Sequence, residues 1–193
     1  ARSVKLMKVK HAVITSVDRD DLRDGGASIW VETIHAIRKL NPTTTMETLI
    51  PDFKGKEKHI QKIIEAKPEV VSHNLETVRS LTKRVRIQAK YDTSLNTLQT
   101  LFKGGIRTKS GIMLGLGEKE SEVIEAMKDL RNVGVKILTL GQYLQPSKKH
   151  LPVVEFITPE QFSYLKEVGL SLGFEHVESS PLVRSSYHAE KHI

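Results

Sequence analysis

The stretch KSGIMLGLGE, Lys109–Glu118, decides the fold of this chain. Its first half is too apolar for an edge strand, and glycines alternate in its second half before a carboxylate. Gly115 and Gly117 lack a Cβ atom, which suits a bend or a close approach of another backbone. Glu118 then opens a polar-fronted helical pattern. The stretch predicts a buried strand ending in a strand-to-helix turn, a common position for a cofactor.

Short β-rich runs alternate with amphipathic helical patterns along the whole chain. The predicted strands cover residues 11–16, 44–50, 69–73, 108–114, 136–140 and 174–178. The predicted helices cover residues 26–40, 55–66, 75–84, 93–103, 119–133 and 159–172. This alternation implies a parallel sheet with right-handed crossovers.

Polar or glycine clusters follow nearly every predicted strand, and a βα barrel builds a site at one rim in this way. No GxGxxG follows the first strand, which disfavours a doubly wound dinucleotide-binding fold. The predicted class is α/β, an incomplete TIM-like (βα) barrel of about six parallel strands whose first strand is missing. Residues 1–193 are expected to form one barrel domain with a tail that contains RSSY, Arg184–Tyr187.

The composition is that of a soluble globular protein, with 38% hydrophobic and 27% charged residues. No apolar run approaches the roughly 18 residues of a membrane span and no signal-peptide pattern opens the chain, so a cytoplasmic location is expected. The net charge of +7 comes without aromatic interleaving, which disfavours a stacking nucleic-acid surface. The charge is either an ordinary solvated basic surface or a means of steering an acidic partner or an anionic cofactor. Ala1 leads directly into a helical pattern, so residues upstream are expected.

Two polar clusters leave functional and structural interpretations open. Ser16 precedes a charged run, Asp18–Asp21, which is either a solvated loop or part of a site; its spacing does not match a calcium loop. Asn74 is a good helix N-cap. In the functional interpretation, Asn74 and Glu76 hydrogen-bond a sugar hydroxyl or an amino group at the barrel rim.

The remaining clusters are equally ambiguous from residue types alone. Gln142 and Tyr143 suit recognition of an adenine edge or a peptide, although Tyr143 could simply plug the barrel. Lys109 is a weak Schiff-base candidate because it lies about five residues below the strand end. His188 and His192, four residues apart, are a weak indication of zinc.

Taken in order, these clusters resemble the lipoyl synthase family of radical S-adenosylmethionine (SAM) enzymes. The resemblance covers essentially the whole chain. The matching motifs are TSVDRDDLRDGGA (15–27), ETLIPDFKG (47–55), SHNLETV (72–78), TKSGIMLGLGE (108–118), LTLGQYLQPSKKHLPV (138–153) and PLVRSSYHA (181–189).

The resemblance implies chemistry that cofactors carry. Such enzymes cleave SAM reductively at a [4Fe-4S] cluster to give a 5′-deoxyadenosyl radical, which abstracts hydrogen from C6 and C8 of an octanoyl chain on a carrier-protein lysine. A second, auxiliary [4Fe-4S] cluster is consumed to supply two sulfurs for the lipoyl group. The implied partners are an octanoylated carrier, either a lipoyl domain or the glycine-cleavage H protein, and an electron donor. No nucleic acid or membrane partner is implied.

The resemblance also implies roles for individual residues. The expected cofactor contacts are Ser16 at the methionine end of SAM, Asn74, Glu76 and Arg86 at its ribose or carboxylate, and Gly115, Gln142, Tyr143 and Leu144 on its adenosine side. In the tail, the resemblance assigns ligation of the auxiliary cluster to Ser186, with Ser185 as the alternative.

The chain departs from the family pattern in its cysteines. The family binds its two clusters through CxxxCxxC and a second cysteine triplet, and this chain has no cysteine. Because iron-sulfur clusters need thiolates, this chain alone is expected to hold neither cluster and to be inactive. Ile87 also stands where the family usually has proline. Two alternatives remain: another sulfur-inserting radical SAM enzyme, such as a biotin synthase relative, and a non-catalytic barrel fragment that binds a carrier domain or an adenosyl ligand.

Overall fold

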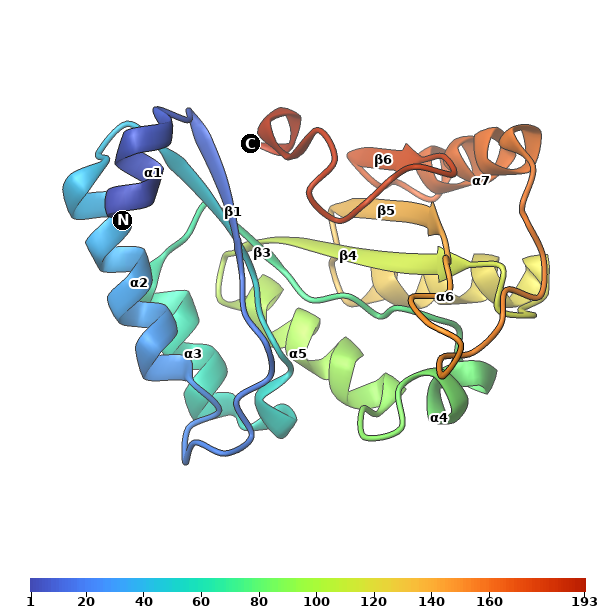
Figure 1. Ribbon diagram of the computed structural model, residues 1–193, viewed down its shortest axis with the longest axis horizontal. Coiled ribbons are helices and arrows are strands. Elements are labelled where there is room, and N and C mark those ends of the chain that lie inside the picture. The colour runs from blue at the N-terminus through green and yellow to red at the C-terminus, as the bar shows by residue number, and fades with distance from the viewer.

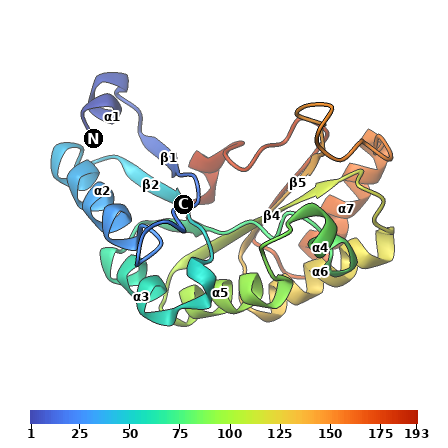
Figure 2. The same ribbon diagram turned by 60° about the horizontal axis from the view of Figure 1, so that its bottom comes forward.

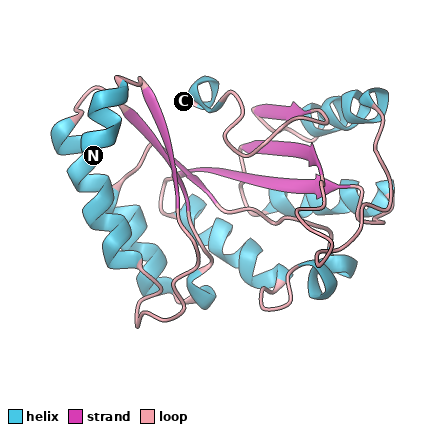
Figure 3. Cartoon of the chain, viewed as in Figure 1, coloured by secondary structure: helices cyan, strands magenta, loops and turns pink.

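The computed structural model describes residues 1–193 (Figures 1 and 3). The strands are β1 (His11–Thr15), β2 (Thr45–Leu49), β3 (Val70–Ser72), β4 (Arg107–Leu114), β5 (Ile137–Gln142) and β6 (His176–Ser179). The α-helices are α1 (Arg2–Met7), α2 (Ala27–Leu40), α3 (Glu57–Ala66), α4 (Thr82–Val85), α5 (Tyr91–Lys103), α6 (Glu120–Asn132) and α7 (Pro159–Ser171). The short 3₁₀ helices are η1 (Phe53–Gly55), η2 (Arg79–Leu81) and η3 (Ala189–His192).

All six strands are parallel and lie in one sheet in the order β1-β2-β3-β4-β5-β6. The sheet is curved (Figure 2). Its edge strands, β1 and β6, do not pair with each other, so the curved sheet stays open as a trough. This arrangement confirms the predicted α/β class and the incomplete TIM-like barrel.

Helices cover the outer, convex face of the sheet, where the apolar core lies (Figure 2). Met127 of α6 and Phe162 of α7 pack in one buried cluster with Leu138 of β5. Ile34 of α2 packs with Met46 of β2 in a second cluster. Burial of such side chains is worth about 1.5–3 kcal/mol each, and it fixes the strands that carry the site.

The inner, concave face carries a layer of polar side chains from β2, β3 and β4. Glu47 of β2 accepts hydrogen bonds from Ser72 of β3 and from Lys109 of β4, and all three side chains are buried. Side chains two residues apart on a strand point to the same face. Leu49 and Gly111, two residues beyond Glu47 and Lys109, therefore form the next layer of the barrel interior, toward the C-terminal ends of the strands.

One predicted helix is wrong in its first half. Helix was expected over residues 75–84, with Asn74 as its N-cap, but helical structure begins only at η2. The intervening segment runs beside β4 instead: the Glu76 N–H donates to the Gly111 carbonyl at 2.9 Å, and the Met113 N–H donates to the Glu76 carbonyl at 2.9 Å. These long-range backbone hydrogen bonds outweigh the local helical preference, because a buried backbone group must be paired.

No helix in the structure combines the length and the apolar character needed to cross a bilayer.

Candidate functional site

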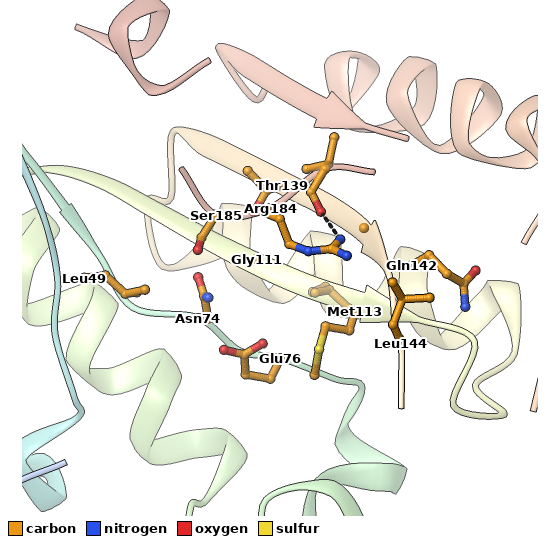
Figure 4. Close-up of a pocket in the computed structure, with 13 residues that line it drawn as sticks. Leu49, Asn74, Glu76, Gly111, Met113, Thr139, Gln142, Leu144, Arg184 and Ser185 are labelled. Atoms are coloured by element: carbon orange, nitrogen blue, oxygen red, sulfur yellow. Dashed lines mark hydrogen bonds between the residues drawn. The ribbon is translucent and has the colours of Figure 1, made fainter. Parts of the chain in front are cut away.

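A cavity of about 330 Å³ opens on the concave face at the C-terminal ends of the central strands (Figure 4). Its walls come from β2, from the segment after β3, from β4 and β5, and from the chain that follows β6. The lining residues are Leu49, Asn74, Glu76, Gly111, Ile112, Met113, Thr139, Gly141, Gln142, Leu144, Val183, Arg184 and Ser185. The volume lies in the range of small-molecule sites, and the position is the usual one for a site in a βα barrel.

Asn74 and Glu76 supply the polar wall of the cavity (Figure 4). The Oδ1 atom of Asn74 is buried and has no hydrogen-bond partner. Burial raises the pKa of the Glu76 carboxyl, while the nearby Asn74 amide and Arg86 guanidinium oppose that rise. Glu76 has a φ of 69°, a left-handed conformation that a side chain seldom adopts. An unpaired buried acceptor is costly, so this wall is suited to a ligand that brings donors.

Arg86 supports this wall from behind and does not line the cavity. Its Nη1 donates to the Asn74 carbonyl at 3.3 Å and to the Ser94 hydroxyl at 3.2 Å. It also borders a separate hollow with Asp18 and Lys90. The structure thus gives Arg86 a bracing role, and its predicted contact with a cofactor stays a prediction.

The turn after β4 has the geometry expected from its glycines. Gly115 and Gly117 have φ values of 99° and 103°, in the region that favours glycine. The Glu118 carboxylate accepts hydrogen bonds from the Gly115 N–H at 2.5 Å and the Leu116 N–H at 2.9 Å. A Cβ on Gly115 would lie 2.3 Å from the Glu155 carbonyl oxygen. Gly115 therefore lets the loop after β5 pack on the strand end, beside the cavity.

Gln142 lines the cavity, but its amide is occupied by the protein itself. Its Nε2 group shares two hydrogens among the carbonyls of Leu114, Tyr143 and Glu155, at 3.1, 3.0 and 3.0 Å. Its Oε1 accepts from the Ile157 N–H at 2.9 Å. The side chain ties the end of β5 to the loop that follows. Its predicted contact with adenosine stays a prediction, and in this structure no amide group is left over to read a base edge.

The two residues after Gln142 differ in their relation to the cavity. Leu144 lines it and is about half exposed. Tyr143 is buried outside the lining, and its hydroxyl donates to the Leu151 carbonyl at 2.8 Å. Tyr143 thus fixes the loop, and Leu144 offers the cavity an apolar side chain.

Ser16 lies apart from the cavity. It is exposed and borders a separate groove between the end of β1 and α2, together with Thr15, Arg19 and Gly26. In the charged run beside it, Asp21 pairs with Arg19 at 2.7 Å and Asp20 pairs with Lys54 at 3.3 Å. The predicted role of Ser16 at the methionine end of SAM is left as a prediction.

The two serines of RSSY have different environments. Ser185 lines the cavity and points into it with Asn74 (Figure 4). Ser186 is exposed, lies just outside the lining and makes no side-chain hydrogen bond within the chain. Its hydroxyl is therefore free to bind an external ligand, and its role as a cluster ligand stays a prediction.

Sequence reasoning missed two glycines of the lining. A Cβ on Gly111 of β4 would lie 2.6 Å from Thr139 Oγ1 and 3.1 Å from Asn74 Oδ1. A Cβ on Gly141 of β5 would lie 2.3 Å from the Val183 carbonyl oxygen. The signal was present, since a glycine inside a buried strand often marks a close approach.

Lys109 lies in the polar layer below the cavity. Its Nζ donates to Glu47 Oε2 at 3.0 Å, and burial lowers its pKa. This position agrees with the expectation that it sits below the reactive rim.

Comparison with known proteins places this geometry in a family. The model of the radical SAM superfamily matches residues 1–130, and the chain belongs to that superfamily. It is 68% identical to the lipoyl synthase of Flavobacterium johnsoniae and 68% identical to the mitochondrial lipoyl synthase of Nematostella vectensis. Each match covers 100% of this chain and 67% of the relative, so the chain spans about two thirds of their length. Within the superfamily, the chain belongs to the lipoyl synthase family, a family of sulfur-inserting enzymes.

Solved structures agree on the fold. HydG, a maturase of the [FeFe]-hydrogenase, matches with a TM-score of 0.71 over 99% of this chain and 53% of that one, at 14% identity. Methylornithine synthase matches with a TM-score of 0.67 over 88% of this chain and 56% of that one, at 14% identity. At such identities the likeness concerns the barrel architecture alone.

Proposed function

We propose that the protein from which this chain comes is a lipoyl synthase, which inserts two sulfur atoms at C6 and C8 of a protein-bound octanoyl chain. The observation that carries the proposal is identity of 56–68% to lipoyl synthases over the whole chain. A second support is the cavity at the C-terminal end of the barrel, with Asn74 and Glu76 on one wall and the RSSY tail on the other.

The cavity fits the adenosyl cofactor of the superfamily. Ribose hydroxyls and the ammonium group of SAM are hydrogen-bond donors, and the orphaned Asn74 Oδ1 and the Glu76 carboxylate are acceptors. Because Gly111 has no side chain, Thr139 Oγ1 and Asn74 Oδ1 can lie close against β4 in the cavity wall. When bound, SAM would supply the hydrogen-abstracting group, while the barrel residues orient it and keep water out.

The residues of this chain, in contrast, are not suited to hold an iron-sulfur cluster by themselves. A [4Fe-4S] cluster is held by cysteine thiolates, and the chain has none. No step of a mechanism can therefore be assigned to cluster-binding residues here. The proposal is that Ser186 adds one oxygen ligand to an auxiliary cluster whose thiolates lie in the remaining third of the protein.

The partners follow from the proposed reaction. They are an octanoylated carrier protein, a lipoyl domain or the glycine-cleavage H protein, and a reductant for SAM cleavage. The proposed location is the cytoplasm for a bacterial source and the mitochondrion for a eukaryotic one; the Nematostella relative is named as mitochondrial.

The full-length protein, reconstituted anaerobically with iron and sulfide, should form 5′-deoxyadenosine and a lipoyl product when an octanoylated carrier is supplied. Both are measured by liquid chromatography with mass spectrometry. The unacylated carrier is the matched control and should give neither product above background. Octanoyl-independent turnover, or no turnover at all, would count against the proposed function.

Replacing Gly111 by Ala is expected to weaken SAM binding to the reconstituted full-length protein about tenfold, because overpacking a well-filled site costs about 1–3 kcal/mol. The new methyl group would displace Thr139 Oγ1 and then Asn74 Oδ1. Affinity is measured by titration calorimetry. Adding Thr139→Ala removes the nearest clashing atom and should restore part of the affinity; undiminished binding in Gly111→Ala would contradict the assignment of this cavity to SAM.

A further inference from the structure

The chain after β6, residues 180–193, here called the C-terminal tail, runs back inside the open barrel (Figures 1 and 2). It first passes the cavity, where Val183, Arg184 and Ser185 form part of the lining. Its last turn, η3, then lies against β1 near the N-terminal ends of the strands. The tail thus enters the lumen between the two sheet edges that do not pair.

The start of the C-terminal tail is fixed by a close approach of its backbone to β5. The Gly141 Cα has no side chain where the Val183 carbonyl passes, and a Cβ there would lie 2.3 Å from that oxygen. The Gln142 N–H also donates to the Pro181 carbonyl at 3.4 Å. These contacts hold the residues immediately before RSSY against β5.

The last residues of the C-terminal tail are fixed by His192, whose side chain is fully buried. Lys109 Nζ lies 3.4 Å from His192 Nδ1 and 3.0 Å from Glu47 Oε2, so the ring joins the polar layer of the barrel interior. Arg107 Nε, at the start of β4, donates to the His192 carbonyl at 2.6 Å. Both the side chain and the backbone of one tail residue are therefore bound by β4.

The chemistry of this contact defines the state of the histidine. A lysine ammonium is only a donor, so Nδ1 must accept and the ring is the neutral tautomer with its proton on Nε2. Glu178 Oε1 lies 4.0 Å from Nε2, beyond hydrogen-bond distance, and Nε2 is buried without a hydrogen-bond partner. Burial, followed by the charge of Lys109, lowers the pKa of His192 to about 3. The ring thus remains an acceptor at neutral pH.

We infer that His192 is a positioning residue: it docks the end of the C-terminal tail into the polar layer beneath the cavity and so holds the RSSY serines at the cavity wall. The two fixed ends, at Gly141 and at Lys109, leave only a short span between them. That span contains both serines. No other part of the tail is bound to β4 through a side chain that is fully buried.

The anchor is tested by hydrogen exchange of the full-length protein, a measurement that needs no turnover. His192→Phe keeps the ring volume but removes the acceptor, so tail amides 183–193 should exchange about tenfold faster, the effect of losing one buried hydrogen bond. β5 amides should keep their protection. His192→Gln retains an acceptor and should return tail exchange toward the wild-type rate. His35→Phe, on the exposed face of α2, is the matched control and should change nothing.

The consequence for catalysis rests on the proposed function, and it is measured in a separate assay of the two reaction products. His192→Phe should lower lipoyl product while 5′-deoxyadenosine formation persists, and His192→Gln should recover product. A variant that harmed only the general stability of the barrel would lower both together. If the wild-type protein made neither product, the proposed function would fail while the exchange result still tested the anchor.

Unchanged tail exchange in His192→Phe would overturn the inference. If that variant misfolds, with faster exchange in β5 as well, deletion of residues 189–193 decides the matter. The deletion leaves every strand intact and should release residues 183–188 while β5 remains protected. Continued protection of residues 183–188 in the deletion variant would show that the His192 contact is not needed to hold the RSSY serines.

Discussion

Replacing Gln142 by Glu is expected to lower the free energy of unfolding by about 3 kcal/mol or more, because each buried group left unpaired costs about 1–3 kcal/mol. The native amide is 5% exposed and donates to three carbonyl oxygens. A carboxylate would set an acceptor against those carbonyls, and a protonated carboxyl could satisfy only one of them. The loss is a large part of the roughly 5–15 kcal/mol that stabilises a typical domain.

Urea denaturation followed by circular dichroism measures this effect. Gln145→Glu is the matched control, since it makes the same change three residues along, where the side chain is exposed and donates only to the His150 carbonyl at 2.9 Å. Its effect should stay within about 0.5 kcal/mol. Equal stability of the two variants would mean that Gln142 does not hold the loop. That result would favour a direct contact of Gln142 with adenosine.

The second large effect is expected in chemistry rather than stability. In the reconstituted full-length protein, Ser186→Ala should reduce lipoyl product about 10-fold to 100-fold, the usual range when a group supporting a metal site is removed. Formation of 5′-deoxyadenosine should change little, because SAM is proposed to bind deeper in the cavity. Ser186 is exposed and makes no side-chain hydrogen bond, so its removal should barely affect folding.

Both products are quantified from the same reaction, and their ratio is the readout. Ser185→Ala is the neighbouring control; Ser185 lines the cavity, so its loss tests a contact with ligand or substrate. A high ratio of deoxyadenosine to lipoyl product in Ser185→Ala alone would transfer the ligand role to Ser185. Equal losses of both products in Ser186→Ala would contradict any role at an auxiliary cluster.

The strands were predictable from sequence because strands of a parallel sheet are largely buried and therefore carry apolar runs. The strand predicted at residues 108–114 ends at Leu114 as expected and begins one residue earlier, at Arg107. The segment from Asn74 to Val78 was not predictable in this way. Its conformation depends on pairing with β4, more than 30 residues further on in the chain, and local propensity does not record that contact.

The site was predictable in part. Asn74, Glu76, Gln142 and Leu144 line the cavity, as expected of residues that follow strands in a βα barrel. Ser16 and Arg86 border other hollows, and Gly115 and Tyr143 lie beside the cavity. The path of the tail could not be derived from spacing, because a polar segment after the last strand gives no local sign that it turns back into the barrel.

That path bears on the order in which the molecule is assembled during synthesis. The tail emerges from the ribosome after all six strands, yet it supplies one wall of the cavity, and its last turn lies against β1. Because chain order delays contacts between distant segments, the cavity should be completed only after the tail has been synthesised.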